Sequence, residues 1–130
     1  MKTFEELGLT PNLTKAIYEI GYESPMPIQE AVIPYLLGEG NDVIALAQML
    51  YGEARGCSLL NQQQCVWCVL NRVDDARFPD SIIGVVSQPG QFYGYSADFP
   101  VWDNLYAVAL DVMQRWAAEK QGAEVARELG

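Results

Sequence analysis

Histidine is absent from this sequence of 130 residues. Its absence removes every Ser–His or Cys–His arrangement that could activate a nucleophile. It also leaves few ligands for a tetrahedral zinc site, because the chain has only three cysteines and a single Cys-x-x-Cys pair. We therefore expect no metal or other cofactor, and we expect any general acid or base to be a carboxylate.

Basic residues are also scarce. Lysine and arginine number 8 against 17 aspartates and glutamates, which gives a net charge of −9. Proteins draw most of their non-specific affinity for nucleic acids from basic side chains, so we expect no nucleic-acid partner. No apolar run approaches the roughly 18–20 residues that span a bilayer, and residues 1–6 lack the apolar stretch of a signal peptide. The chain as it stands is thus expected to be cytoplasmic, with no membrane partner.

Cysteine occurs at Cys57, Cys65 and Cys68. The odd number leaves at least one thiol free unless chains pair. The last two form a Cys-x-x-Cys motif, which is found in redox sites and in half zinc sites. The apolar helical pattern around them favours a plainer interpretation, in which Cys65 and Cys68 are small core residues of a helix.

The spacing of apolar residues in the first third of the chain predicts two helices. Residues 11–20 place four apolar side chains on one face, and Gly21 follows as a natural end. Pro25 and Pro27 then impose an extended segment, because each disfavours helix in the residue before it. Residues 28–37 return to helical spacing.

A turn-rich stretch at residues 38–42 separates these helices from the rest of the chain. Beyond it we expect a helix over residues 43–55. The longest helix is expected over residues 102–121, ended by Gly122. Nothing after the turn-rich stretch supplies parallel strands, so the predicted fold class is all-α or mainly α, with little or no sheet.

One series of residues spans the first part of the chain: Phe4, GYESPMPIQ at 21–29, Ile33-Pro34 and DVI at 42–44. This series resembles the opening of the DEAD-box RNA helicases, including their Q motif, and runs to about Gln48. The resemblance implies that Gln29 reads the edge of an adenine while Phe4 stacks nearby. However, the glycine-rich phosphate loop with its lysine does not follow. We therefore expect no ATP hydrolysis, and a vestigial adenine-nucleotide-binding fragment is the weakest interpretation.

A second series follows in order: LAQMLYGEARG at 46–56, VLNRV at 69–73, FPDSI at 78–82, QPGQF at 88–92 and PVW at 100–102. This series resembles the spore-cortex-lytic cell-wall hydrolases over residues 42–122. The resemblance implies a lysozyme-like helical core and a peptidoglycan-cleaving glycosidase of the lytic transglycosylase type. Its partners would be glycan strands, cut between N-acetylmuramic acid and N-acetylglucosamine in the cell wall or spore cortex.

The two resemblances meet at residues 42–48, where a helicase would form a buried strand and the hydrolase a helix. An N-cap at Asn41 or Asp42 favours the helix. We therefore interpret the chain as a chimera, with a helical leader at residues 1–41 and a truncated hydrolase core at residues 42–130.

The leader is apolar enough to need a partner surface. Its large aliphatic side chains are expected to pack on the hydrolase helices or on a second copy of the chain, giving a homo-oligomer; they are Ile17, Ile20, Ile28, Ile33, Leu36 and Leu37. The family resemblance also implies a tail beyond Leu129 that lines the far side of the cleft. We therefore expect activity to be impaired, and the alternative function is a catalytically inactive folding scaffold.

Glu53 is the candidate catalytic residue. It lies three residues after Leu50 and seven after Leu46, so on a helix it borders the buried stripe and is expected to be partly buried. It also lies in the last turn, where the helix dipole disfavours a negative charge. Such a glutamic acid can protonate a glycosidic oxygen. The alternative is a solvated glutamate that pairs with Arg55 or with another neighbour.

A second candidate group follows the Pro-Gly turn at residues 89–90. Its members are expected to bind sugar, because aromatic faces pack on pyranose rings and an amide can hold an N-acetyl group; they are Gln91, Phe92, Tyr93 and Tyr95. In the alternative, Phe92 and Trp102 anchor this loop in the core. Arg55 and Arg72 are expected to tie helix ends together by hydrogen bonds.

Overall fold

The computed structural model describes residues 2–39, 41–92 and 95–129. Its elements, in chain order, are the 3₁₀ turn η1 (Glu5–Leu7) and the helices α1 (Pro11–Ile20), α2 (Pro27–Glu39), α3 (Asn41–Ala54), α4 (Leu59–Val73), α5 (Ile82–Val86) and α6 (Asp103–Leu129). No strand occurs among the described residues. The all-α prediction is confirmed. Within the same residues, no helix is long and apolar enough to cross a membrane.

The first helix has the ends that its sequence predicts. The Thr10 hydroxyl accepts a hydrogen bond from the Leu13 amide at 3.2 Å. Pro11 occupies the first helical position, where a missing amide proton costs nothing. Gly21 ends the helix with φ of 123°, a conformation that other residues rarely adopt.

The last helix is longer than predicted. We expected Gly122 to end it, but α6 continues to Leu129. A glycine within a helix costs only about 1 kcal/mol relative to alanine. Residues 123–129 are mostly strong helix formers, including two alanines, two glutamates, an arginine and a leucine. Their propensity outweighs the single glycine.

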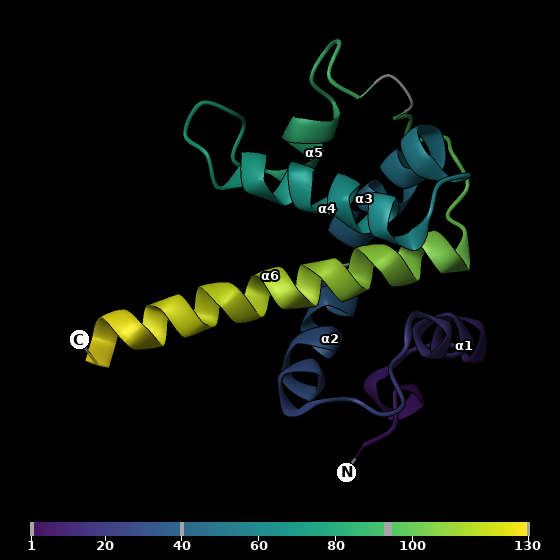
Figure 1. The fold of residues 1–130 in the computed structure, drawn as a ribbon, viewed down its shortest axis with the longest axis vertical. Helices are drawn as coiled ribbons and strands as arrows, with labels where there is room; N and C mark the ends of the chain where they lie inside the picture. Colours follow the sequence, from purple (N-terminus) through teal and green to yellow (C-terminus); the bar gives the residue numbers. More distant parts are fainter. Residues whose placement is uncertain (1, 40, 93–94, 130) are drawn as a thin grey trace.

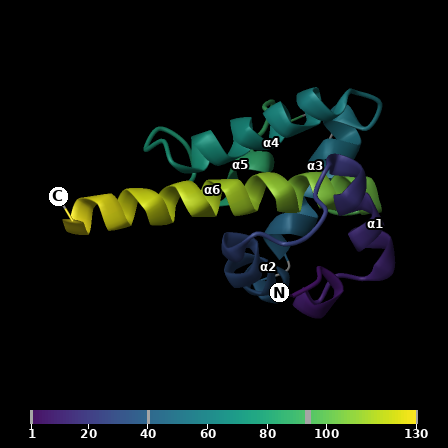
Figure 2. The same cartoon turned by 60° about the horizontal axis from the view of Figure 1, so that its bottom comes forward.

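The long helix α6 is the centre of the fold. The leader helices α1 and α2 lie on one side of it, and α3 and α4 lie on the other (Figures 1 and 2). The short helix α5 packs on α3 and α4. The C-terminal turns of α6 extend past the other helices in both views.

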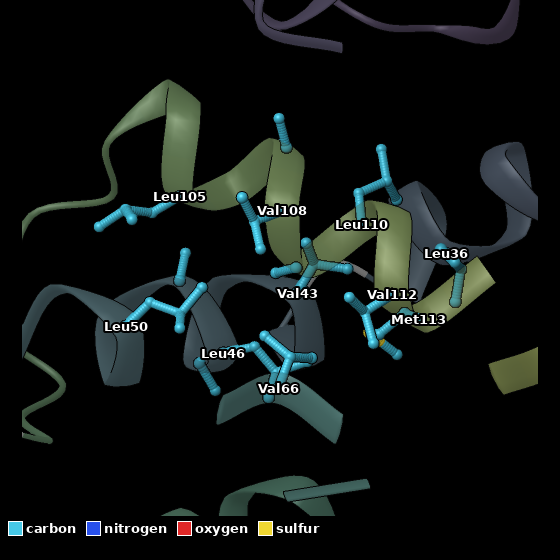
Figure 3. Close-up of a cluster of buried hydrophobic side chains, with 14 of the residues drawn as sticks. Leu36, Val43, Leu46, Leu50, Val66, Leu105, Val108, Leu110, Val112 and Met113 are labelled. Atoms are coloured by element: carbon cyan, nitrogen blue, oxygen red, sulfur yellow. The ribbon is translucent and has the colours of Figure 1, made fainter. Parts of the chain in front are cut away.

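The core is built mainly where α3 meets α6. Val43, Leu46 and Leu50 of α3 face Leu105 and Val108 of α6 (Figure 3), and all five are buried. They recur at the spacing of one helical face. These apolar residues of each helix thus lie on one buried face, and DVI at 42–44 belongs to a helix, not to a strand.

The leader shares this core. Ile17, Ile33 and Leu36 are buried, and their helices contact α6. Ile20 and Leu37 are half-buried against the same cluster. The prediction that the leader packs on the hydrolase-like helices is therefore confirmed for these residues, and the side chain of Ile28 lies outside the described ones.

A buried carboxylate joins the leader to both α6 and α4. Asp111 of α6 is 1% exposed. Its Oδ1 accepts hydrogen bonds from the Tyr22 hydroxyl at 2.6 Å and from Arg115 Nε at 3.1 Å. Its Oδ2 accepts one from Gln63 Nε2 of α4 at 3.3 Å. Burial and the hydrogen bond to Asp111 raise the pKa of Tyr22, so its hydroxyl remains a donor well beyond neutral pH.

Replacing Tyr22 by phenylalanine should therefore lower stability. Tyr22→Phe keeps the ring but leaves the buried Asp111 carboxylate without its shortest hydrogen bond, which should reduce the free energy of unfolding by about 1–3 kcal/mol. Urea denaturation followed by circular dichroism measures this change. Tyr18→Phe is the matched control, because Tyr18 is exposed and a phenylalanine would keep its edge contact with Phe4. Equal stability of the two variants would contradict the role assigned to Asp111.

Candidate active site

Glu53 lies on an open groove between the end of α3 and the first half of α4. The groove has a volume of about 380 Å³ and is lined by Glu53, Ala54, Cys57, Asn61, Gln64, Cys65 and Cys68. The side chain of Glu53 is exposed. The expectation that it would be partly buried is wrong, because α4 covers the adjacent Ala54, which is buried, and leaves Glu53 at the mouth of the groove.

A glutamine side chain helps to hold the turn that carries the groove. Gln62 Nε2 donates to the carbonyl oxygens of Ala54 at 3.1 Å and Cys57 at 3.3 Å. Gln62 is itself buried. Carbonyls at the end of a helix lack partners within it, so this side chain fixes the end of α3, and Glu53 with it, against the start of α4.

Arg55 also ties the end of α3 together, as predicted. Its guanidinium donates from a terminal nitrogen to the Tyr51 carbonyl at 2.7 Å and lies 4.5 Å from the centre of the Tyr51 ring. That ring contacts Trp102 at 4.9 Å between centroids. Tyr51 and Glu53 are two residues apart on a helix, so they point to nearly opposite sides. Trp102, which is 42% exposed, therefore lies away from the groove.

One residue of the second predicted group contacts α4 beyond the groove. Residues of α4 that recur every three or four positions share one exposed face; they are Asn61, Gln64, Cys65, Cys68 and Arg72. A terminal guanidinium nitrogen of Arg72 donates to Gln91 Oε1 at 3.1 Å. Asn61 and Arg72 are roughly 16 Å apart along the helix axis. Gln91 thus contacts the side of α4 that carries the groove residues, beyond the residues that line the groove itself.

The other predicted sugar-binding residues differ in their placement. Phe92 is half-buried against the core, and the Arg72 guanidinium lies 5.2 Å from its ring centre. Tyr95 is also half-buried against the core. The position of Phe92 agrees with the alternative in which it anchors the loop in the core, whereas Trp102, the other anchor of that alternative, is exposed. Tyr93 lies outside the described residues.

The cysteines do not occupy the core positions predicted for them. Cys68 is exposed and Cys65 is only half-buried. The buried face of α4 is formed by Val66, Val69 and Leu70, and the cysteines lie beside it, facing the groove. Cys65 and Cys68 follow Asn61 and Gln64 at helical spacing, which places all four on one side of α4. That spacing could have predicted the groove wall, whereas we expected the two cysteines to lie in the core. Among the described residues, no group of three or more metal-binding side chains could hold an ion.

The helicase-like residues are core residues here. Phe4 is 0% exposed, and its ring meets Tyr18 and Tyr22 edge-on at centroid distances of 5.9 and 6.4 Å. Gln29 is 2% exposed, and its Oε1 accepts a hydrogen bond from the Met26 amide at 2.8 Å. Neither side chain is available to an adenine ring in this structure.

Comparison with known sequences identifies two different kinds of relative. The sequence model of the family described as Cell Wall Hydrolase matches residues 58–126, which is more than half of the chain. A spore cortex-lytic enzyme of Oceanobacillus iheyensis is 35% identical over 80 residues, covering 58% of this chain and 29% of that protein. Glu53 precedes the residues matched by the family model.

RNA helicases form the other group of relatives. The ATP-dependent RNA helicase ddx19 of Dictyostelium discoideum is 44% identical over 59 residues, covering 45% of this chain and 13% of that protein. The DEAD-box ATP-dependent RNA helicase RhpA of Helicobacter pylori is 46% identical over 57 residues, covering 44% and 11%. The chain thus spans a small part of each of these relatives. No solved structure matches it.

ATP should not bind despite the helicase-like sequence. Gln29 and Phe4 are buried within the leader, and adenine recognition without phosphate contacts contributes little affinity. Isothermal calorimetry with millimolar ATP and Mg²⁺ should show no heat beyond dilution. A dissociation constant in the micromolar range would contradict this assignment and would show that the leader keeps a nucleotide site.

Proposed function

This chain belongs to the cell wall hydrolase family, and we propose that it cleaves the glycan strands of peptidoglycan with Glu53 as the general acid. The observation that carries the proposal is the position of Glu53. Its carboxyl group lies on an open groove whose wall also presents the amides of Asn61 and Gln64. Amides of this kind can hold the N-acetyl groups of amino sugars by hydrogen bonds.

The number of carboxylates supports one mechanism over another. Two-carboxylate glycosidases place a pair of acidic side chains on either side of the scissile bond. Among the described residues that line this groove, Glu53 alone is acidic. A mechanism in which one carboxyl group serves two steps therefore fits the site better than one that needs a pair.

We propose lytic transglycosylation as that mechanism. Glu53 first donates its proton to the oxygen between N-acetylmuramic acid and N-acetylglucosamine, so that the bond breaks as the leaving hydroxyl forms. The 6-hydroxyl oxygen of the muramic acid then attacks the anomeric carbon, and the Glu53 carboxylate accepts the proton of that hydroxyl. The product is a 1,6-anhydro ring, and the catalytic proton returns to Glu53.

The residues of the groove wall would orient the glycan strand. Gln91 lies at the Arg72 end of the exposed face of α4, and Asn61 lies at the Glu53 end. We propose that a glycan strand runs along this face and contacts both ends. Gln91 would bind the strand through its amide nitrogen, because its oxygen already accepts from Arg72.

The test of this proposal is the substitution Glu53→Gln. Glutamine keeps the shape but has no proton to donate, so the rate of cleavage should fall by about 10²–10⁴-fold. Glu53 is exposed, so unfolding stability should change by no more than about 0.5 kcal/mol. Digestion of purified peptidoglycan, followed by mass spectrometry of anhydro-muropeptides, measures the activity.

Glu5→Gln is the matched control, because Glu5 is also exposed and lies in the leader. It should cleave as the unaltered protein does. Equal product from Glu53→Gln and the unaltered protein would contradict the catalytic role. Absence of product from every protein would contradict the proposed activity and favour the scaffold interpretation.

A further inference from the structure

The three cysteines of the chain meet at one place. Cys57 lies in the turn between α3 and α4, while Cys65 and Cys68 lie one helical turn apart on α4. All three are free thiols and all three line the groove that carries Glu53. Cysteine is a minor component of this chain, yet every copy of it faces the same open volume.

The three thiols differ in exposure. Cys57 and Cys68 are exposed, whereas Cys65 is half-buried. Burial raises the pKa of the Cys65 thiol, and the negative charges of Cys57, Glu53 and Cys68 raise it further. The thiolate is the reactive form. Cys65 should therefore react more slowly than its two neighbours.

We propose that this groove is a site of reversible thiol modification, in which Cys57 and Cys68 exchange with low-molecular-weight disulfides. The thiolate sulfur attacks one sulfur of the small disulfide, and the bond between the two small-molecule sulfurs breaks. A mixed disulfide forms on the protein, and the other half leaves as a thiolate that takes up a proton. An excess of small thiol reverses the step by the same exchange.

Modification of these thiols should block glycan cleavage, and this part of the proposal rests on the function proposed above. A peptide-sized adduct on Cys57 or Cys68 would lie beside Glu53, because both cysteines line the same groove as Glu53. The adduct and a glycan strand would then compete for the same surface. The adduct therefore blocks cleavage under oxidising conditions, and reduction restores it.

Oxidised glutathione is the probe for the modification itself. The reduced full-length chain is incubated with it, and intact mass and peptide mapping follow the adducts over time. We expect one glutathione each on Cys57 and Cys68, with Cys65 modified severalfold more slowly. Cys57→Ser and Cys68→Ser should each lose one adduct, and Cys65→Ser should keep both. Equal rates of modification at all three cysteines would overturn the proposal. So would a folded chain that forms no adduct under conditions in which the urea-unfolded chain is modified.

The effect on the groove is measured as a ratio of cleavage rates with and without glutathione treatment. The unaltered chain and Cys65→Ser should lose most activity on treatment and recover it with dithiothreitol, whereas the double variant Cys57→Ser, Cys68→Ser should keep its untreated rate. Unchanged cleavage by a fully modified chain would overturn the blocking role. The adducts are measured without any glycan, so this experiment tests the thiol modification independently of the proposed cleavage.

Discussion

The buried carboxylate of Asp111 is the constraint on which the rest of this structure depends. Removing a charge from water costs several kcal/mol unless hydrogen bonds replace the lost hydration. Here those bonds come from three places: Tyr22 after α1, Arg115 one turn along α6 and Gln63 on α4. Asp111 is therefore satisfied only when the leader and α4 are both docked on α6. With α4 fixed in this way, its exposed face becomes the wall of the groove in which Glu53 lies.

Two parts of the chain that resemble different families thus form one folded unit. The helicase-like part contributes buried side chains to the same core as the hydrolase-like part, including Phe4 and Ile33. Residues 42–48, where we expected the two resemblances to meet, are part of the helix α3. Gln48 in that helix donates to the carbonyls of Ala97 and Phe99, which holds the segment before α6 against α3. The leader is a structural part of this protein.

Local patterns predicted the fold well and the site less well. The ends of α1 and the apolar stripes of α3 and α6 depend on residues close in sequence, and they could be predicted. The exposure of Glu53 depends on how α4 lies against α3, which no spacing within α3 reveals. Gln29 shows a further limit, because a resemblance implied adenine binding while the fold around it buries the side chain. The bonds that Asp111 makes with Tyr22 and Gln63 join residues 89 and 48 positions apart, which is beyond the reach of any local pattern.

Native-state hydrogen exchange tests most directly whether the two parts form one unit. The slowest amides of α1, α3 and α6 should exchange with the same free energy of opening, equal to that of global unfolding, because a cooperative unit opens as a whole. Ile17, Leu46 and Leu110 are suitable reporters, since each is buried within its helix. Exchange of Ile17 through an opening several kcal/mol below that of Leu46 and Leu110 would contradict the account, because the leader would then detach while the rest remained folded.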